Sequence, residues 1–491
     1  MERLTQRQRR WTTAIAITVI VLMTTYVALD ILGVLRNRGP ALLAMPLPHP
    51  GERVLVIAPH EDDETLGCGG YMQAAVDAGV EVYVCLMTAG EGEELGAVWA
   101  SRSPDLSPQD FVRLGQIRER ESLRALTSIG IPPDHVIFLN YPNTGLAAMW
   151  TARYFDPANP WTSRYTRTTH SPFSGGLTPQ APFCGAAVLA DLETVLKRVQ
   201  PTQVFVTHPG DIHPDHWPTY CFTRLALAKL AAGHAVPLQV RLYTYLVHRR
   251  GWPTPWGYYP YLRLTPPPAL AELPLNRWLT FPLGIGQISQ KNRMIVDYHS
   301  QAAAFDFLLR AFARRNEIFA LVSDVAMLDG TVADRTLLEE PTRETEFLRH
   351  HPEADLAWVD LCYQGSATQV SFGVVGDVKG STIAMVNLMV VAPPDKRPRG
   401  LLVQYQKGKP LMTWLDAGAG VVPAPAPLPI TATQVGNRVI VTLPADYAGG
   451  GGPVLLDVWL RTHRHIVDHA LTRLFQPAAP AATAEKVETR G

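Results

Sequence analysis

The chain has 491 residues, more than one ordinary hydrophobic core accommodates, and this length favours two or three domains. Its 44 lysines and arginines balance 44 aspartates and glutamates, so the overall charge gives no support for nucleic acid or another polyanion as a partner. The five cysteines show no C-x-x-C spacing, which argues against a disulfide scaffold and against a zinc–thiolate knuckle. We expect them to be small buried side chains.

The first predicted element is a membrane-spanning helix at residues 11–35. An uncharged run from Trp11 to Leu29 approaches the roughly 20 residues that a helix needs to cross a bilayer. Arginines are more numerous before this run than after it, so residues 1–10 are expected to be cytoplasmic and the body of the protein extracytoplasmic. A cleaved signal peptide is the alternative, although no clear small-x-small cleavage site follows the run. Residues 36–52 form a proline-rich linker.

Strand-like and helical patterns alternate between residues 53 and 325. Apolar runs predict strands at 53–58, 81–88, 135–140 and 203–208. Amphipathic runs between them predict helices at 70–79, 110–131 and 186–200. Such alternation is typical of crossover connections in a mostly parallel sheet with helices on both faces. We therefore predict a Rossmann-like α/β domain over residues 53–325.

The pattern becomes β-rich after a predicted connector at 326–366. Apolar runs at 368–378, 381–391, 400–406, 437–444 and 453–461 are separated by proline- and glycine-rich stretches. These runs predict a β-sandwich-like accessory domain over residues 367–475, which either stabilises the protein or binds a glycan. The alanine- and proline-rich end, residues 476–491, is predicted to be a disordered tail.

Two segments rich in histidine and aspartate follow predicted strands. The first, "HEDDE" at residues 60–64, comes just after the strand at 53–58, and the second, "HPGDIHPDH", begins where the strand at 203–208 ends. Because open α/β sheets bind ligands at the carboxyl ends of their strands, we expect these side chains to converge. Zinc accepts nitrogen and oxygen ligands of this kind, so the two segments together predict a metal site.

Two other interpretations of the first segment are weaker. A nucleotide-binding turn is suggested by Gly67, Gly69 and Gly70, but Met72 occupies the last position of the G-x-G-x-x-G spacing, and carboxylates stand where phosphates need positive potential. An isolated acidic run is most often a solvated face, with Glu64 favouring the start of a helix.

The pairing of "APHEDDE" with "HPGDIHPDH" resembles the two signature motifs of the PIG-L or LmbE-like family of zinc-dependent de-N-acetylases, which is related to the N-acetylglucosaminyl-phosphatidylinositol deacetylases. Four further stretches agree with the resemblance, which covers roughly residues 53–320: "CLMTAGEGEELG", "IRERESLRALTSIGI", "VIFLNYPNTGL" and "KNRMIVDYHSQAAAFDFLLRAFARRNEIF".

The resemblance implies a ligand set and a base. His60, Asp63 and His216 would hold the zinc, and Asp62 would be the general base. Three protein ligands leave one position for water, and zinc can lower the pKa of that water to roughly 7. Nitrogen and oxygen ligands also accept iron and other divalent ions, so the metal itself stays open.

The resemblance also implies roles for residues around the ligands. His213 would be the protonated partner that stabilises the oxyanion and assists the leaving amine, with Asp215 holding its ring. Arg118 and Asn143 match substrate-contacting positions, although the family often has aspartate where Asn143 stands, and the nearby Arg120 leaves the register open. Glu61 occupies a position where the family usually has proline.

Two further stretches allow more than one interpretation. The aromatic-rich segment at residues 249–262 is either a wall that stacks on a sugar, a lip that faces a membrane, or a packed loop. The histidines at positions 463, 465 and 469 lack an accompanying carboxylate loop, so a surface cluster is favoured over a second metal site.

We therefore expect a membrane-anchored zinc hydrolase that removes an acetyl group from an amino sugar in a glycolipid, a cell-wall glycan or a related glycoconjugate. Its expected partners are this substrate and the membrane, with no nucleic acid. Two alternatives stay open: a carbohydrate-binding or scaffolding protein whose deacetylase-like domain is inactive, and an amidase that acts on a non-sugar conjugate.

Overall fold

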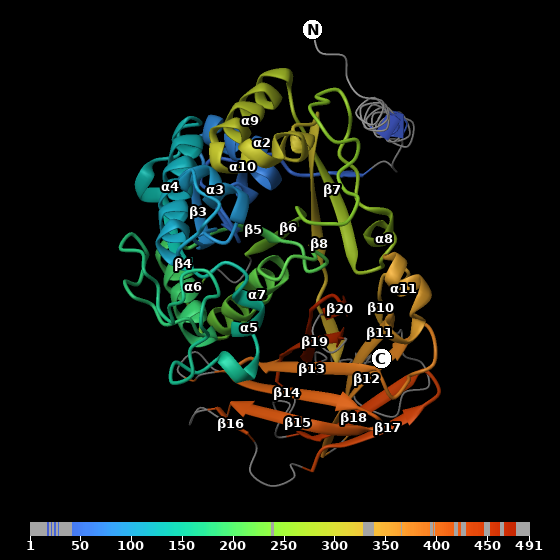
Figure 1. Cartoon of the computed structure of the whole chain (residues 1–491). Coiled ribbons are helices and arrows are strands. Elements are labelled where there is room, and N and C mark those ends of the chain that lie inside the picture. The colour runs from blue at the N-terminus through green and yellow to red at the C-terminus, as the bar shows by residue number, and fades with distance from the viewer. Residues whose placement is uncertain are drawn as a thin grey trace, which may run out of the picture.

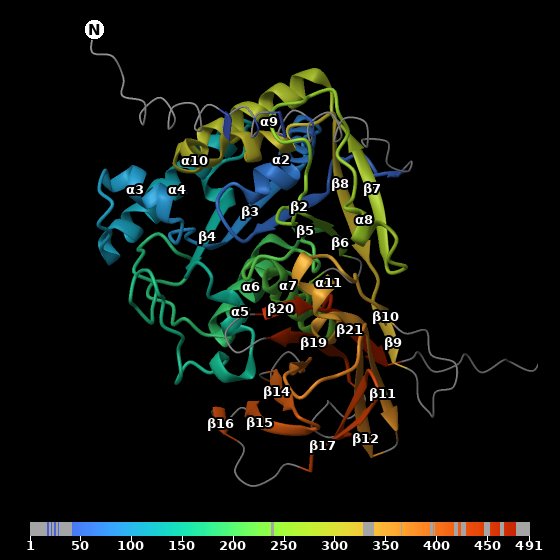
Figure 2. The same cartoon turned by 45° about the vertical axis from the view of Figure 1, so that its right-hand side comes forward.

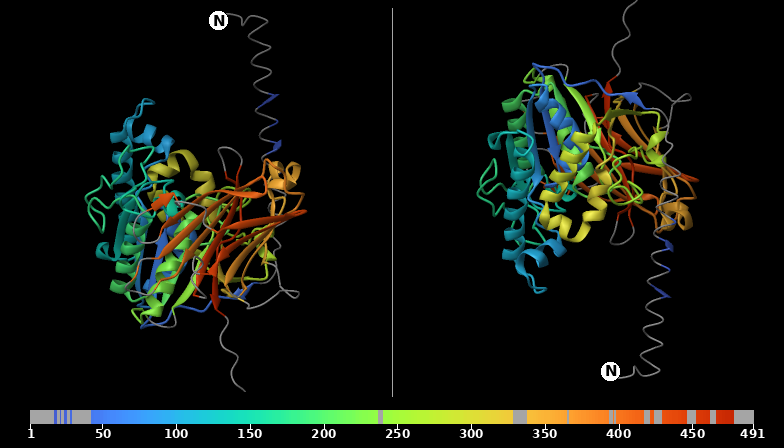
Figure 3. Two further views of the ribbon diagram at one scale, coloured as in Figure 1. Left: turned by 90° about the horizontal axis from the view of Figure 1, so that it is seen from below. Right: turned by 90° about the horizontal axis from the view of Figure 1, so that it is seen from above.

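The chain forms an α/β part followed by a β-rich part, coloured blue to yellow and orange to red in Figure 1. Seen from above, the helices at the end of the α/β part lie nearest the viewer, and seen from below the β-rich strands do (Figure 3). The structure, a computed structural model, describes isolated positions between 17 and 28 and then residues 42–236, 240–327, 338–364, 366–392, 396, 398–416, 421–423, 429–445, 452–461 and 466–477.

The predicted single-pass membrane location is wrong for the part of the chain that the structure describes. No helix among those residues combines the length and the hydropathy needed to cross a bilayer. Apart from a few isolated positions, the span predicted at 11–35 lies outside the described residues, as do residues 1–10 and most of the predicted linker. An uncharged run of about 20 residues is necessary for a span but is not sufficient evidence for one.

A mixed sheet with the strand order β1-β7-β8-β6-β5-β2-β3-β4 forms the centre of the α/β part. Strands β2 to β6 are parallel to one another, and β8 is antiparallel to both β6 and β7. The four predicted strands are confirmed as β2, β3, β4 and β5, with ends that differ by at most one residue. The bounds are β1 Leu43–Ala44, β2 Arg53–Ala58, β3 Glu81–Thr88, β4 Val136–Tyr141, β5 Gln203–Thr207, β6 Arg241–Tyr245, β7 Asn276–Pro282 and β8 Asn316–Val322.

Helices cover both faces of this sheet because its central strands are buried on both sides. In β2, Val54 and Val56 belong to a core shared with α2 and α9, whereas Leu55 and Ile57 belong to a core shared with α6 and α7. Figure 2 shows these two helix pairs on opposite sides of β2, β3 and β5. The helix bounds are α2 Asp63–Asp77, α3 Glu94–Ser101, α4 Pro108–Thr127, α5 Leu146–Met149, α6 Gly185–Val199, α7 His216–Ala232, α8 Pro268–Ala271, α9 Ile285–Asp297, α10 His299–Leu309 and α11 Glu346–His350, with short 3-10 turns at η1 Pro133–His135, η2 Ala152–Tyr154, η3 Arg310–Phe312 and η4 Pro352–Ala354.

Helix α2 begins at Asp63, earlier than the helix predicted at 70–79. Because glycine has low helix propensity, the glycines of this segment led to a predicted start that is later than the observed one. Packing explains why they are there. A Cβ atom on Gly67 would lie 2.2 Å from the ring of Tyr245, and one on Gly70 would lie 2.4 Å from the side chain of Leu283. The glycines therefore allow α2 to approach the sheet closely.

Two sheets pack around one core in the β-rich part, which agrees with the predicted strand-rich domain. Their orders are β10-β11-β12-β18-β17 and β16-β15-β14-β13-β19-β21-β9, with β20 paired to β19. Phe372, Val386 and Val458 lie in the core between them. The bounds are β9 Val325–Met327, β10 Leu338–Glu339, β11 Leu356–Gln364, β12 Ala367–Val374, β13 Ile383–Val390, β14 Arg399–Gln406, β15 Lys409–Asp416, β16 Val421–Pro423, β17 Thr431–Val435, β18 Arg438–Pro444, β19 Val454–Arg461, β20 Ile466–His469 and β21 Arg473–Pro477.

The β-rich part begins earlier than predicted. Strand β11 lies inside the segment predicted as a connector, 326–366, and pairs along its length with β12. An irregularity between Leu356 and Trp358 shifts the register of this strand. A one-residue shift moves the following side chains to the other face, so the alternation of apolar and polar residues is obscured in the sequence.

A buried seam joins the two parts along α6 and α7. Met389, Leu455 and Leu474 of the β-rich sheets belong to the same apolar core as these helices. At the seam, the fully buried carboxylate of Asp457 accepts a hydrogen bond from Nε1 of Trp150 at 2.5 Å. The β-rich part therefore supports the helix that begins at His216.

The prediction for the cysteines is confirmed, whereas two smaller predictions fall mostly on residues outside the described part of the chain. All five cysteines are free and buried, as expected of packing side chains; they are Cys68, Cys85, Cys184, Cys221 and Cys362. The histidines at 463 and 465 and most of the predicted tail, 476–491, lie outside the described residues.

Candidate metal centre and active site

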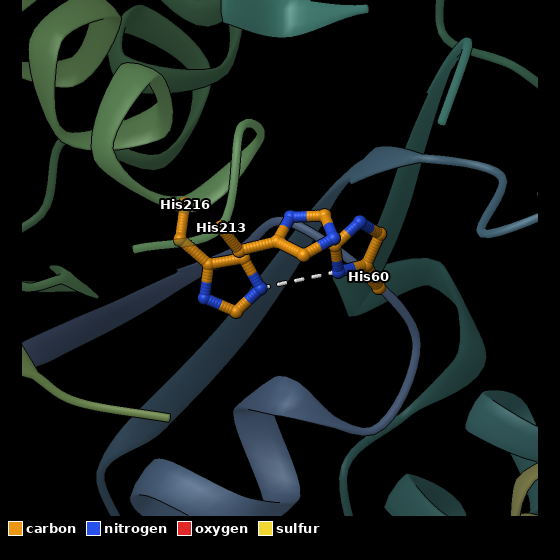
Figure 4. A group of neighbouring side chains, drawn as sticks. All are labelled: His60, His213 and His216. Carbon is orange, nitrogen blue, oxygen red and sulfur yellow. Dashed lines mark hydrogen bonds between the residues drawn. The ribbon is translucent and has the colours of Figure 1, made fainter. Parts of the chain in front are cut away.

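The predicted metal ligands meet at the carboxyl ends of two neighbouring strands. His60 lies two residues after the end of β2, and His216 is the first residue of α7, which follows β5. Because β2 and β5 are parallel partners, the segments after them start at the same edge of the sheet. Figure 4 shows the rings of His60, His213 and His216 turned toward one another from these two segments.

Three of the predicted ligand atoms form a closed triangle. Nδ1 of His60 and Nε2 of His216 each lie 3.1 Å from Oδ2 of Asp63, and the two nitrogens are 3.2 Å apart. Ligand atoms about 2.0–2.1 Å from one zinc ion at tetrahedral angles are separated by about 3.4 Å. The triangle therefore suits a single cation bound by all three residues, which are at most 5% exposed.

Each ligand histidine has a second carboxylate on its far ring nitrogen. Nε2 of His60 lies 3.0 Å from Oδ2 of Asp215, and Nδ1 of His216 lies 3.0 Å from Oδ2 of Asp211. A neutral imidazole carries one N–H group, which can be donated to this far carboxylate while the near nitrogen offers its lone pair. Carboxylate–histidine pairs of this kind support the ligands of many metal sites, so the donor set fits a metal ion.

The same contacts stabilise positive charge at the ligand triangle. Burial alone would lower the pKa of His60, but its hydrogen bonds with Asp215 and Asp63 raise the pKa to about 9. Burial also opposes a charge on His216, yet Asp211 and Asp63 raise its pKa to about 10. Although burial acts in the opposite direction, these histidines hold the pKa of Asp63 well below its ordinary value.

Asp211 and His248 complete the site, although neither residue was assigned a role from the sequence. Besides His216, Asp211 accepts hydrogen bonds from two backbone N–H groups just after β6, at 3.2 and 2.8 Å. The ring of His248 lies 4.6 Å from that of His216, and ligand atoms of His248, His216 and Asp63 lie within 4.8 Å of one another. The position of β6 next to β5 is the signal that could have indicated this third segment.

Asp62 lines a cavity together with His60 and Asp63, and its backbone conformation is unusual. Its φ is 120° and its ψ −30°, values that non-glycine residues rarely adopt and that often mark functional sites. Its N–H group donates to Oε2 of Glu64 at 3.2 Å. Burial raises the pKa of Asp62 to about 8, against the opposing charge of Arg118. A carboxylate with a pKa in this range is suited to accept a proton from water.

Glu61, the residue in the position usually held by proline, forms a buried pair with Arg118. Nε of Arg118 lies 3.3 Å from Oε2 of Glu61, and its Nη2 and Nη1 donate to the carbonyl oxygens of Glu61 at 2.5 Å and of Gly90 at 3.0 Å. A Cβ atom on Gly90 would lie 2.2 Å from Oε2 of Glu61, so glycine is required there. Arg118 lines the cavity whereas Arg120 is exposed, which places Arg118 in the predicted position.

The expected contact between the Asp215 carboxylate and the ring of His213 is not formed. Oδ2 of Asp215 lies 4.0 Å from Nδ1 of His213, which instead accepts a hydrogen bond from the backbone N–H of Asp215 at 3.1 Å. The carboxylate is held by the N–H groups of Thr144 at 2.5 Å and Leu146 at 3.0 Å. Because Nδ1 accepts this hydrogen bond it carries no proton, and burial also lowers the pKa of His213, so a neutral ring replaces the expected protonated one.

Asn143 belongs to the polar lining of the cavity. Its backbone N–H group lies 3.1 Å from both carboxylate oxygens of Glu91, which holds the segment after β4 beside the ligand triangle. Burial raises the pKa of Glu91 to about 7. The structure therefore brings Asn143 and Arg118 into one cavity with the predicted ligands His60 and Asp63.

This cavity has a volume of about 490 Å³ and is lined by both polar and apolar side chains. The polar lining includes the predicted ligands His60 and Asp63 with Asp62, Arg118 and Asn143, and the third predicted ligand, His216, contacts Asp63 from outside the lining. The aromatic-rich segment at 249–262 contributes Trp252, Pro253 and Trp256 to the apolar lining. Of the interpretations left open for that segment, its placement favours a wall of the binding cavity.

Comparison with a family model gives a match over residues 55–227, to the family described as PIG-L, GlcNAc-PI de-N-acetylase. The match includes every predicted ligand and the predicted base, Asp62, and it ends before the β-rich part.

Two curated relatives are 1D-myo-inositol 2-acetamido-2-deoxy-alpha-D-glucopyranoside deacetylases. The protein from Mycolicibacterium smegmatis is 32% identical over 194 residues, which are 38% of this chain and 58% of that protein. The protein from Rhodococcus jostii is 30% identical over 188 residues, which are 37% of this chain and 55% of that protein. The chain therefore spans little more than half the length of these relatives.

Solved structures of similar fold include two deacetylases. N,N'-diacetylchitobiose deacetylase from Pyrococcus horikoshii matches with a TM-score of 0.33 and 20% identity, covering 55% of this chain and 84% of that one. The A40926 pseudoaglycone deacetylase Dbv21 matches with a TM-score of 0.34 and 19% identity, covering 55% of this chain and 97% of that one.

Proposed function

Because residues 55–227 form a PIG-L family domain, we propose that this protein is a zinc-dependent hydrolase that removes the N-acetyl group from an amino sugar. The substrate class in this proposal is a glycolipid, a cell-wall glycan or a related glycoconjugate. The activities of the curated relatives, which act on an acetylated amino sugar linked to inositol, support the sugar part of the proposal.

The observation that carries the proposal is the triangle of His60, Asp63 and His216, of which His60 and Asp63 line one cavity together with Asp62. A zinc ion held by this triangle would supply a Lewis acid and a water molecule that is readily deprotonated. Asp211 and Asp215 keep the two ligand rings in the orientation that presents their lone pairs.

The proton transfers are assigned to side chains of this cavity. Asp62 accepts a proton from the attacking water and returns it to the departing nitrogen, and the second proton of the water follows, so water and amide become acetate and the protonated amine. In neutral His213, Nδ1 accepts the N–H of Asp215, and Nε2 therefore carries the proton. This N–H group can donate to the oxygen of the amide carbonyl as negative charge develops there.

The test uses the zinc-loaded full chain and a panel of N-acetylated amino sugars and their conjugates, with the released amine detected by fluorescamine. We expect Asp62→Asn to lower kcat by about 10²- to 10⁴-fold while the zinc content of the protein is unchanged. Asp105→Asn, in an exposed loop, is the matched control and should retain full activity.

Two results would contradict the proposal. Unchanged turnover by Asp62→Asn would exclude Asp62 as the base. Release of no amine from any member of the panel by a protein with one bound zinc would reject the deacetylase function itself.

A further inference from the structure

Apolar side chains from α10, η3 and the segment at 249–262 form an apolar wall of the cavity. Helix α10, which is kinked at Phe305, contributes Phe305, Leu308 and Leu309 to the lining, and Phe312 follows in η3. Trp252 packs edge to face against Phe312 with ring centroids 5.5 Å apart. Because Nε1 of Trp252 donates to the carbonyl oxygen of Thr265 at 2.7 Å, the polar atom of this indole is already bonded.

The wall continues from the cavity onto the protein surface. Trp256 lines the cavity and is 38% exposed, and its ring centroid lies 5.9 Å from that of Phe307, which is 45% exposed. Ile212 is also in the lining of the cavity and is 55% exposed. Exposed apolar side chains that continue the lining of a cavity indicate a binding surface, whereas single ones need no explanation.

Two of the charged groups close to this wall, Arg249 and Arg310, are paired. Arg249 donates to the carbonyl oxygen of Gly210 at 2.6 Å and forms a short ion pair with Glu344. Arg310 lies 3.5 Å from the carboxylate of Asp306 and contacts the ring of Tyr258. Arg250 also lines the cavity near this wall, and its side chain is exposed to solvent. The wall therefore offers hydrocarbon to a ligand.

The size of the cavity also exceeds what the reacting amide requires. Its volume of about 490 Å³ lies in the range of about 300–1,000 Å³ in which pockets enclose whole drug-sized ligands. Apart from Ile212, the wall residues named above follow residue 227, so they lie outside the segment that matches the family model. The family match therefore gives no account of this wall of the cavity.

We propose that this wall is a subsite for an alkyl chain carried by the acylated amino sugar. This inference rests on the proposed function, because the polar lining must hold the sugar and its amide. The chain either belongs to the acyl group on nitrogen or is attached to the sugar through its anomeric oxygen. In both cases it leaves the ligand triangle along α10 and emerges over the exposed ring pair of Trp256 and Phe307.

The experiment measures kcat/KM of the zinc-loaded full chain for two substrate series. One series keeps the N-acetyl group and lengthens the anomeric alkyl group of an N-acetylglucosaminide from methyl to octyl; the other keeps the methyl glycoside and lengthens the acyl group from acetyl to octanoyl. We expect kcat/KM to rise in one series by about two- to four-fold for each added CH₂ group. A rise in the first series identifies a chain on the sugar, and a rise in the second identifies a chain on nitrogen.

Variants of the wall separate this inference from the proposed function. Leu308→Ser should lower kcat/KM for the octyl or octanoyl substrate by about ten-fold or more relative to kcat/KM for the N-acetyl methyl glycoside. Trp256→Ser repeats the test at a more exposed position, in case the first variant is unstable. Ile285→Ser is the matched control because Ile285 is 85% exposed and lies outside the cavity.

Turnover of the short substrate without a gain from either chain would overturn the alkyl subsite and leave the deacetylase proposal intact. If no substrate is turned over, calorimetric binding of the octyl glycoside to zinc-loaded Asp62→Asn decides: binding much tighter than that of the methyl glycoside supports the subsite, and equal affinities overturn it.

Discussion

Two buried clusters of this protein contain aspartate and histidine, and they differ in their hydrogen-bond donors. At the cavity, Asp63 faces two histidine nitrogens that also face each other. At the seam between the two parts, Asp457 has His469 at 3.7 Å but also receives hydrogen bonds from Trp150 and Thr472.

The donors decide what each cluster can bind. An indole N–H and a hydroxyl group satisfy the carboxylate of Asp457, and an indole nitrogen has no lone pair for a metal. The ligand atoms at the cavity converge as acceptors, and their protons can be placed on the far carboxylates, Asp215 and Asp211. Burial of aspartate and histidine together therefore does not indicate a metal site; convergence of their lone pairs does.

The largest expected effect separates the histidines of the two clusters. His216→Ala removes a ligand and should lower the zinc content from about one ion per chain to nearly none, with at least about a thousand-fold loss of amine release. His469→Ala should keep its zinc. Metal analysis of both purified variants checks this, and equal zinc contents would contradict the assignment of His216.

The next effect concerns stability at the seam. Asp457→Ala removes the carboxylate that accepts from the buried donors of Trp150 and Thr472, each at a cost of about 1–3 kcal/mol, so we expect the free energy of unfolding to fall by about 2–6 kcal/mol. Urea unfolding measures the change, with Asp105→Ala as control. A loss below about 1 kcal/mol, or a loss of zinc by the folded variant, would remove the distinction between the clusters.

The smallest effect compares the supporting groups. Asp211→Asn weakens the acceptor behind His216 and should lower the affinity for zinc by about 10- to 100-fold while the fold is retained. Thr472→Val removes one donor from Asp457 and should change stability by about 1 kcal/mol with no effect on zinc affinity. Competition with a fluorescent zinc chelator gives both affinities, and equal values for the two variants would show that Asp211 does not support the site.

The strands and the ligand triangle could be predicted because both depend on local patterns. The apolar run of β2 is continuous since helices cover both of its faces, and the residues just after β2 and β5 must lie at one edge of the sheet. His60, Asp63 and His216 follow from that rule together with the family resemblance. Asp211 was visible in the second motif, but its function depends on the backbone after β6, which no short motif includes.

Other features depend on contacts between distant segments and could not be predicted. The carboxylate of Asp215 turns to His60 and to the N–H groups after β4, although sequence proximity suggested His213. The apolar wall combines a loop after β6 with α10, and either segment alone has the composition of an ordinary packed element. The membrane prediction is wrong for the described residues, among which no helix has the length and hydropathy to cross a bilayer, although the uncharged run and the arginine distribution suggested one.

The seam along α6 and α7 also limits how this protein can be divided. A fragment that ends near residue 325 would uncover the apolar surface that Met389, Leu455 and Leu474 cover, on the helix whose first residue is His216. Loss of activity in such a fragment would report misfolding of α7 rather than a missing binding function. The smallest piece suitable for biochemistry is therefore longer than the family domain and includes both β-rich sheets.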